Sequence, residues 1–290
     1  MKNIKLLALC AIAAGIVLSC QKEEISNDFL EVQPESLELS KDLQSMLLDA
    51  GVNPAGAFLE DIQLLDEVSK EYIVAGDIML EVKLLKEGAY SLENIVENGV
   101  NNKQYRTNNL VAGSNRSINI LGFTGSGNAL TSRMRNGLQF AVNNYNRLNN
   151  NLTFNLAFGS NIQNADMIVF NNNRSGAGGS AGFPSNGAPN RLVQINGGTG
   201  SFSNDINEHV ITHEIGHSIG LRHTDFARRR CGGGNEGISN SGAINIPGTP
   251  TENRWGFDGI DSNSIMISCL DGSENGEFSN FDVVALNFLY

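Results

Sequence analysis

Basic side chains are scarce in this sequence, and their scarcity argues against one class of partner. Lysine and arginine together number 20, against 31 aspartates and glutamates, which gives a formal net charge of −11. Because phosphate chains bind clustered lysines and arginines, a nucleic-acid partner is not expected. The one basic cluster, residues 228–230, is interpreted as a loop face or as a subsite for acidic residues of a substrate.

Internal repeats are lacking, and the apolar run at residues 6–18 is too short for a stable membrane span. Lys2 and Lys5 precede this run, and Ser19 and Cys20 follow it. A charged start, an apolar stretch and small residues in this order are typical of a signal peptide. We therefore expect residues 1–19 to be a signal peptide and the mature chain to leave the cytoplasm.

The end of this leader resembles a bacterial lipobox. Residues 17–20 read VLSC, and in such a motif the peptidase cuts before the cysteine, which then receives a lipid. Cys20 would thus be the first mature residue and the membrane anchor. Residues 21–24, QKEE, resemble the acidic export signal of some surface lipoproteins. A plain secretion signal is the alternative, so the protein is expected to be an outer-membrane or cell-surface lipoprotein, or secreted.

Cysteine is also scarce, with four in the chain. Cys10 lies within the leader and Cys20 is the candidate for lipid attachment, so only Cys231 and Cys269 remain for the folded part. In an oxidising compartment, two remaining cysteines suggest a disulfide bond.

The chain after the leader is long enough for one large domain and a smaller leading segment. We place the boundary in the polar, Asn-rich connection of residues 98–109, so that residues 20–110 form an N-terminal segment and residues 111–290 the main domain. In the N-terminal segment, the apolar spacing predicts a short helix within residues 34–53, with Ser40 as its cap, and a strand within residues 71–80 that ends at Gly76-Asp77.

The main domain contains both strands and helices. Its patterns predict strands at residues 117–123, 152–158, 166–170 and 191–196, and helices at residues 128–149, around residue 213 and at residues 281–289, the last with Ser279 and Asp282 as a capping pair. Residues 175–190 are rich in Gly, Ser and Pro and predict a long loop. This order predicts an α+β fold, in which a twisted mixed sheet has a backing helix and an active-site helix, and an irregular C-terminal part ends in a helix.

Candidate metal ligands are concentrated in residues 213–223, which read HEIGHSIGLRH. His213 and His217 are four residues apart, so on a helix both imidazoles project from one face and can meet one ion. Gly220 allows the backbone to turn after the helix and bring His223 round as a third nitrogen ligand. Three neutral imidazoles leave a fourth position open to water, which is typical of a catalytic zinc site.

Three further residues near this motif are candidates for a role. Glu214 lies beside the metal position, where it can take a proton from an attacking water molecule and pass it to the leaving amine as general base. His209 is either a further ligand or a packed residue, since zinc sites seldom need a fourth histidine. Asp225 either orients a histidine through its free ring nitrogen or begins the next turn.

Residues 213–223 complete the pattern HExxHxxGxxH, and the chain resembles the metzincin zinc metallopeptidases. The HEIGH sequence followed by HTD at residues 223–225 is most similar to the bacterial dual-action HEIGH metallopeptidases, relatives of the astacins. Supporting stretches are AGFPS at 181–185, IPGTP at 246–250 and FSNFD at 278–282. The resemblance implies a metzincin-like domain and a zinc-dependent endopeptidase with one catalytic zinc ion.

The resemblance also implies a Met-turn, in which Met266 would form an apolar floor under the histidines without binding the ion. Astacins and serralysins carry a tyrosine two residues later, but Ser268 stands there, so another donor must help the zinc hold the oxyanion. Cys231 follows the third ligand and Cys269 follows the Met-turn, and both elements must converge on the ion. We therefore predict a disulfide bond between these two cysteines.

Residues 74–78, VAGDI, resemble the segment with which astacin prosegments place an aspartate on the zinc, although Val74 stands where that pattern has phenylalanine. A carboxylate there would occupy the open position and displace water. We hypothesise that residues 21 to about 110 are a prosegment, with Asp77 as the blocking ligand, released by cleavage near Lys103 or Arg106.

The resemblance also implies how a protein or peptide substrate binds. It would pair antiparallel with an edge strand, for which residues 191–196 are the candidate, and residues 246–251 would line the specificity pocket. The alternatives are an exopeptidase or amidase with the same metal site, and a surface adhesin or binding lipoprotein with a decayed site, against which the intact motif argues. Calcium in the Gly/Asn/Asp-rich loops stays open, without support from the sequence.

Overall fold

The computed structural model describes residues 39–64, 68–90, 104–232, 235–236, 243–250 and 252–290. The chain divides into two compact units, Met1–Leu30 and Glu31–Tyr290, and all described residues belong to the second. The expected signal peptide and lipid-attachment residue Cys20 therefore lie outside the described residues. In the described part of the chain, no helix has both the length and the apolar composition of a membrane span.

The described residues form short helices and strands in alternation. The α-helices are α1 Lys41–Asp49, α2 Val82–Lys86, α3 Ser132–Asn146, α4 Asn204–Ser218 and α5 Asn280–Leu289, and the 3-10 helices are η1 Gly113–Asn115 and η2 Gly197–Ser201. The strands are β1 Phe58–Ile62, β2 Lys70–Ala75, β3 Ile78–Glu81, β4 Tyr105–Arg106, β5 Ser117–Phe123, β6 Thr153–Gly159, β7 Met167–Asn171, β8 Gly179–Ala181, β9 Leu192–Ile195, β10 Leu221–Arg222 and β11 Ile244–Asn245.

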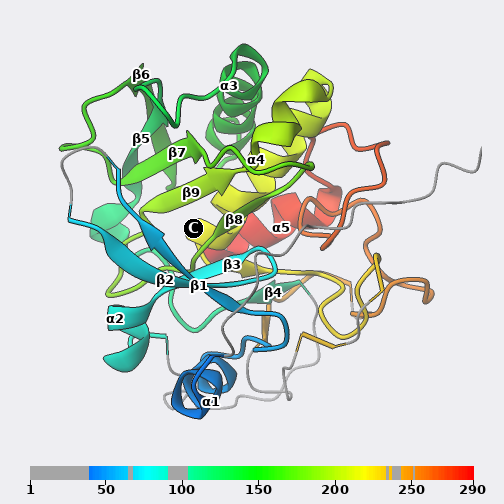
Figure 1. Cartoon of the computed structure of the whole chain (residues 1–290). Coiled ribbons are helices and arrows are strands. Elements are labelled where there is room, and N and C mark those ends of the chain that lie inside the picture. The colour runs from blue at the N-terminus through cyan, green and yellow to red at the C-terminus, as the bar shows by residue number, and fades with distance from the viewer. Residues whose placement is uncertain (1–38, 65–67, 91–103, 233–234, 237–242, 251) are drawn as a thin grey trace, which may run out of the picture. The chain divides into compact units, whose positions relative to one another are not determined.

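Eight strands form one mixed sheet in the order β1-β2-β3-β8-β9-β7-β5-β6 (Figure 1). β5 pairs in parallel with β6 and β7, and β7 pairs in parallel with β9. β8 is antiparallel to β9, and β3 joins β8 in parallel, with Ile78 opposite Ala181. A smaller sheet places β4 between β10 and β11. The predicted α+β class, with a mixed sheet and several helices, is confirmed.

The strand that precedes α4 is not at an edge of the sheet. The sequence predicts an edge strand at residues 191–196, but β9 lies between β8 and β7. This prediction was wrong because residues 175–190, which the composition predicts as a loop, contain β8. That strand has only three residues, Gly179–Ala181, which are too small and too few to give an alternating apolar signal.

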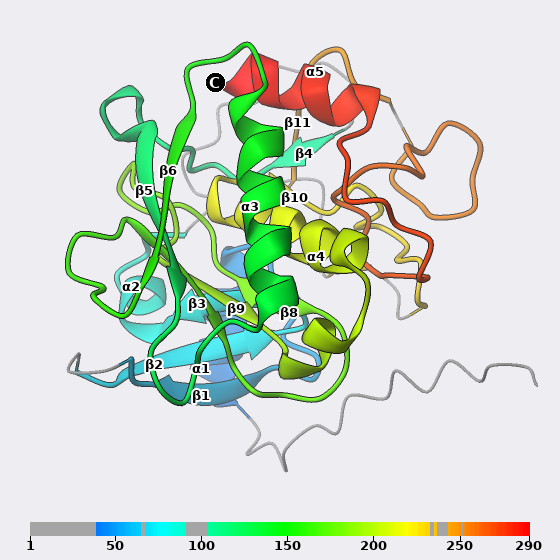
Figure 2. The same ribbon diagram turned by 90° about the horizontal axis from the view of Figure 1, so that it is seen from above.

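Helices α3 and α4 pack against each other and against the sheet (Figure 2). The buried side chains of α3 recur at helical spacing and include Met134, Leu138 and Tyr145. In α4, every residue from Ile206 to Ser218 is buried. The polar residues of α4 therefore lie inside the protein, and their placement there needs specific partners.

The N-terminal strands share apolar cores with the later part of the chain. Tyr72 and Val74 of β2 cluster with Phe170 of β7 and Leu192 of β9. Ile73 points the other way, into a cluster that includes residues of α1 and α2. Alternate residues of one strand thus contribute to two cores, as the two faces of a strand require.

Most predicted elements agree with the structure except at their ends. The helix predicted at residues 128–149 begins after Thr131, whose Oγ1 accepts a hydrogen bond from Met134 N at 3.2 Å. Ser40 caps α1 as predicted. The predicted capping pair of Ser279 and Asp282 at the start of α5 is confirmed as a capping box.

Gly137 determines how closely α3 approaches α4, and it provides a test of this packing. A Cβ at Gly137 would lie 2.7 Å from the backbone carbon of Asn207 and 2.8 Å from Glu208 N. Alanine is favoured over glycine within a helix by about 1 kcal/mol, but overpacking against backbone atoms costs about 1–3 kcal/mol. We therefore expect Gly137→Ala to lower the free energy of unfolding by up to about 2 kcal/mol in denaturant titrations. Asn136→Ala, at an exposed position of α3, is the control, and equal stability of the two variants would contradict the close contact.

Candidate metal centre

Helix α4 carries two of the three expected metal ligands. The helix begins after Ser203, whose Oγ accepts a hydrogen bond from Ile206 N at 3.2 Å. His213 and His217 are one turn apart on this helix, and their ring centroids are 4.7 Å apart. Both rings are buried, because α4 itself runs through the interior.

The chain turns after α4 and brings His223 back to this pair. Gly220 has a φ of +109°, and a Cβ there would lie 2.9 Å from the carbonyl oxygen of Asn109, so the turn requires glycine. The next residues form β10, which pairs with β4 and directs the following His223 toward α4. The turn predicted at Gly220 is thus present.

Four ligand-type side chains converge on one point. Nε2 of His213 lies 3.1 Å from Nε2 of His217 and 3.1 Å from Nε2 of His223, and the last two are 3.2 Å apart. Asp77, in the turn between β2 and β3, places Oδ2 at 2.9 Å from Nε2 of His223 and at 3.7 Å from Nε2 of His213. All four ligand atoms lie within 4.8 Å of one another.

The second nitrogen of each ring contacts an acceptor. Nδ1 of His213 lies 2.8 Å from the Ile265 carbonyl oxygen, and Nδ1 of His217 lies 2.9 Å from the Leu221 carbonyl oxygen. A carbonyl oxygen can only accept, so these two Nδ1 atoms carry the proton and the Nε2 lone pairs face the common point. Nδ1 of the third ring contacts the carboxylate of Glu236.

This donor set fits a zinc ion. Ligands at about 2.0–2.1 Å from a tetrahedral zinc ion lie about 3.4 Å from one another, and the ring nitrogens are 3.1 to 3.2 Å apart. Lone pairs at such separations repel unless a proton or a cation lies between them. Three imidazoles and one carboxylate are moreover ligand types that zinc prefers.

The charges in this cluster act strongly on one another. Burial alone would raise the pKa of Asp77, but His223, His213 and the Arg229 guanidinium outweigh burial and hold that pKa well below its usual value. Burial likewise lowers the pKa of His223, but the carboxylates of Asp77 and Glu236 outweigh it and raise the pKa to about 10. The two carboxylates therefore favour the protonated form of His223.

Glu214 lies beside the cluster without joining it. Its side chain is buried, and Oε2 has no hydrogen-bond partner among the described residues. Burial, followed by the negative charge of Asp77, raises the pKa of this carboxyl well above its usual value. Strand β8 passes close by, since a Cβ at Gly179 would lie 3.0 Å from Oε1. A buried oxygen without a protein partner here is suited to accept a proton from a substrate or a water molecule.

Met266 packs against the ligand helix. A Cβ at Gly216 would lie 2.6 Å from the Met266 Sδ, so the glycine within HEIGH leaves room for this methionine. The Met266 carbonyl accepts a hydrogen bond from Thr224 N at 2.8 Å, directly after His223. The methionine segment therefore contacts both stretches of chain that carry the histidines.

A buried carboxylate holds the residue before Met266. Asp282 Oδ2 accepts a hydrogen bond from Ile265 N at 2.8 Å, and Oδ1 accepts from Ser264 Oγ and from Gln104 Nε2, each at 2.7 Å. The carbonyl of the same Ile265 accepts from His213 Nδ1. The start of α5 is thus linked through Ile265 to the orientation of a candidate ligand.

Asp225 does not orient a histidine. Oδ1 of Asp225 accepts from Ser268 N at 3.0 Å, and Oδ2 accepts from Ser268 Oγ at 2.9 Å and from Arg230 N at 2.8 Å. The Nδ1 atoms of all three histidines contact other groups, so the orienting role considered for Asp225 is contradicted. This carboxylate instead fastens the loop after His223 to the position where astacins carry a tyrosine.

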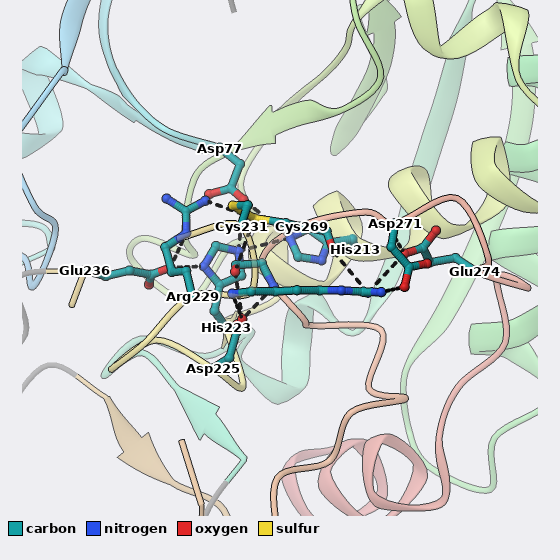
Figure 3. Close-up of a disulfide and its surroundings, with 12 residues drawn as sticks. Asp77, His213, His223, Asp225, Arg229, Cys231, Glu236, Cys269, Asp271 and Glu274 are labelled. Atoms are coloured by element: carbon teal, nitrogen blue, oxygen red, sulfur yellow. Dashed lines mark hydrogen bonds and ion pairs between the residues drawn. A yellow bond between two sulfur atoms is a disulfide. The ribbon is translucent and has the colours of Figure 1, made fainter. Parts of the chain in front are cut away.

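The disulfide bond predicted between Cys231 and Cys269 is present, with the two Cα atoms 5.8 Å apart (Figure 3). It connects the loop after His223 to the segment after Met266. Together with Asp225, it gives two links between the same two stretches of chain.

The basic cluster at residues 228–230 divides into separate contacts. Arg228 lies over the ring of Phe257, with 5.6 Å between its Cζ and the ring centroid. Arg230 forms ion pairs with Asp271 and Glu274. Only Arg229 acts on the metal cluster, through the charge of Asp77.

Two other candidates lie away from the point of convergence. The His209 ring is stacked at 6.4 Å from the His213 ring, and His209 is not part of the ligand group, in agreement with a packed residue. Ile246 belongs to the main core, and Thr249 is buried and donates to the Ile246 carbonyl at 2.8 Å. These two side chains therefore do not line an open pocket, and residue 251 lies outside the described residues.

Glu236 is the site residue that the sequence did not reveal. It stands 13 residues after His223, in a Gly-rich stretch without periodicity, and no motif connects it to the histidines. An acidic residue in a loop after the third ligand is too common a feature to be singled out. The link from Asp282 to Ile265 was missed as well, although Asp282 was expected to cap the last helix.

Comparison with known proteins gives a family match. A family model described as dual-action HEIGH metallo-peptidase matches residues 73–290. Two solved structures of myroilysin are similar to the chain, each with a TM-score of 0.35. The first is 18% identical, and the match covers 58% of this chain and 77% of the myroilysin chain. The second is 17% identical, and the match covers 67% of this chain and 90% of the myroilysin chain. No curated protein matches the sequence.

The carboxyl of Asp282 gives a pH-dependent test of the network around Ile265. In the folded protein, burial raises the pKa of Asp282 to about 6, although the hydrogen bonds that its carboxylate accepts lower the pKa. In an unfolded chain, the pKa of an aspartate is about 3.9. Because the folded-state pKa is raised, the stability contributed by the proton is complete below about pH 4 and is lost as the pH rises through about 6.

Asp282→Asn cannot lose this proton. We therefore expect the free energy of unfolding of the variant, minus that of the wild type, to rise between pH 4 and pH 8 by at most about 3 kcal/mol. Denaturant titrations with chelator present measure the difference, with the exposed Asp258→Asn as control. A difference that does not change with pH would contradict the raised pKa.

Proposed function

The chain belongs to the dual-action HEIGH metallopeptidase family, and from this membership we propose that it is a zinc-dependent endopeptidase of the metzincin type. Its substrates, as for any peptidase, are proteins or peptides. The observation that carries the proposal is the convergence of three buried Nε2 atoms, 3.1 to 3.2 Å apart, beside a carboxylate oxygen of Glu214 that has no hydrogen-bond partner among the described residues.

In this proposal, His213, His217 and His223 hold the zinc ion. The bound ion would make water acidic enough to act as a nucleophile near neutral pH and would polarise the carbonyl of the bond to be cut. Glu214 takes the proton of the attacking water, because its Oε2 is buried with no described protein partner, and then gives it to the leaving amine. Met266 supports the ligand helix by packing against Gly216.

We also propose that Asp77 keeps the full chain inactive. Its Oδ2 lies where the three nitrogens leave a fourth position, and a zinc ion with four protein ligands has no place for water. The turn that carries Asp77 is fastened to β8, since Ala181 N donates to the Asp77 carbonyl at 2.9 Å. The N-terminal segment therefore blocks the metal position and covers β8 at once.

Strand β8 replaces the originally expected edge strand as the surface for substrate. With β3 withdrawn, β8 would be the exposed strand next to the site, and an extended peptide can pair with its backbone. Gly179 of β8 lies next to Glu214, which supports this placement. The peptide bond to be cut would then lie close to the general base.

The activating cut is proposed to fall before Gln104. Arg106 lies in β4, the central strand of the smaller sheet, and its neighbour Tyr105 is buried. A cut at Arg106 would therefore break a paired strand that directs His223. Lys103, the other basic residue considered, lies outside the described residues.

An exopeptidase remains the second candidate because of one observation. The Arg229 guanidinium acts on the carboxylate of Asp77 at the fourth position, and a fixed cation there can also receive the terminal carboxylate of a peptide. Product mass spectrometry separates internal from terminal cuts.

Export and lipid attachment at Cys20 are likewise proposed. The disulfide bond of Cys231 and Cys269 supports export, since such bonds persist mainly in oxidising compartments.

Glu214→Gln tests the mechanism directly. The variant keeps the shape of the side chain but cannot accept a proton, so we expect cleavage of a denatured protein, measured after removal of the N-terminal segment, to fall by about 10²–10⁴-fold. Zinc content should stay unchanged, because Glu214 is not part of the ligand group. A chelator should abolish the wild-type activity.

The matched control is Glu208→Gln, a buried glutamate of the same helix that bonds to Asn144 and not to the histidines. If Glu214→Gln cleaved as fast as the wild type, the mechanism would be wrong. A wild type that binds zinc but cuts no substrate even after removal of the N-terminal segment would support the adhesin alternative.

Asp77→Ala tests the proposed latency. In the full-length chain we expect this variant to be more active than the wild type, because the fourth ligand position is then free for water. After removal of the N-terminal segment, both proteins should have equal activity. Asp61→Ala, at an exposed position of β1, is the control. Equal activity of full-length and trimmed wild type, with no effect of Asp77→Ala, would rule out the blocking role.

A further inference from the structure

We propose that Glu236 is a positioning residue of the metal centre, which fixes the ring of His223 and strengthens its hold on the metal. Glu236 accepts a hydrogen bond from His223 Nδ1 and faces no other histidine among the described residues. The inference rests on the proposed function, because it takes His223 as a ligand. Figure 3 shows Glu236 on the side of His223 that faces away from His213.

The acceptor on His223 differs in kind from those on the other two rings. His213 and His217 donate to backbone carbonyls, which are neutral. His223 donates to a carboxylate, which attracts the Nδ1 proton more strongly and leaves more electron density on Nε2 for the metal. The third ligand, which α4 does not carry, is thus the one with the strongest orienting partner.

Glu236 is itself held in place by several contacts. Its side chain is only 11% exposed. Oε2 lies 3.9 Å from Arg222 Nη2, Oε1 lies 3.7 Å from Arg229 Nε, and the backbone N donates to the Phe226 carbonyl at 3.0 Å. The disulfide at Cys231 fastens the same loop to the methionine segment. The carboxylate therefore approaches His223 from a fixed direction.

Energetics separate this role from that of an ordinary ion pair. A nearly buried carboxylate is costly to desolvate, and its attraction to two guanidinium groups at 3.7 and 3.9 Å offsets only part of that cost. Removing a carboxylate from buried ion pairs lowers stability, whereas removing the partner of a metal-bound histidine typically lowers metal affinity 10- to 100-fold. The two roles thus predict effects on different measurements.

The experiment compares the full-length wild type with Glu236→Gln, Glu236→Ala and Glu236→Asp. Zinc dissociation constants come from competition with a chelator, and the absorption spectrum of the cobalt-loaded protein reports the ligand geometry. The control is Glu274→Gln, whose carboxylate lies 3.2 Å from Arg230 and contacts no histidine (Figure 3). Thermal unfolding of the metal-free proteins reports any loss of structure.

We expect Glu236→Gln and Glu236→Ala to bind zinc about 10- to 100-fold more weakly, with a changed cobalt spectrum. Glu236→Asp should recover part of the affinity, and Glu274→Gln should match the wild type. If Glu236→Ala does not fold, the Gln variant, which keeps the same shape, decides the question.

A folded Glu236→Gln with wild-type zinc affinity and spectrum overturns the inference. So does a loss of unfolding temperature in the metal-free variant together with unchanged zinc affinity, because that indicates an ion pair with a structural role only. A wild type that binds no metal would instead refute the proposed function. A wild type that binds zinc, with weaker binding in the variants, but that cuts no substrate even after removal of the N-terminal segment, would support Glu236 and refute the peptidase.

Discussion

Three imidazole nitrogens held 3.1 to 3.2 Å apart inside the protein are the constraint on which the rest of the structure depends. Lone pairs at such distances repel, so their positions must be imposed by the scaffold or balanced by a cation. Helix α4 imposes two of them through its own repeat. The third nitrogen belongs to His223, which lies outside the helix. The turn at Gly220 and the pairing of β10 with β4 bring His223 to the other two histidines.

Buried polar groups, and not a sheet, hold the part of the chain between His223 and α5 in place. Among the described residues between His223 and α5, the short strand β11 is the one regular element, yet the segment that carries Met266 must stay in contact with α4. Asp282 binds it from α5, Asp225 binds it from the loop after His223, and the disulfide bond repeats the second link. Each carboxylate accepts several hydrogen bonds, which offset part of the cost of its burial. An irregular segment can thereby hold a candidate ligand as firmly as a strand does.

The sequence predicted what is local and missed what depends on distant parts of the chain. The spacing of His213 and His217, the turn at Gly220 and the capping box of α5 follow from residues a few positions apart, and all are present. β8 was missed because its three small residues carry no alternating pattern, and because one of its two partner strands, β3, is far away in the sequence. Glu236 was missed because no pattern in its loop indicates that the loop folds back onto His223. The position of this loop depends on the disulfide bond of Cys231, whose partner lies 38 residues away.

The N-terminal segment is joined to the rest of the sheet in a way that bears on how the proposed latency ends. The backbone pairing is small, with one register pair between β3 and β8. The apolar contacts are larger, since Val74 and Met79 share a cluster with Phe170 and Leu192. Burial of apolar side chains typically contributes about 1.5–3 kcal/mol each, and cutting one peptide bond removes none of these contacts. A cut before Gln104 therefore leaves the segment bound, and the metal position opens only when the segment dissociates or is itself degraded.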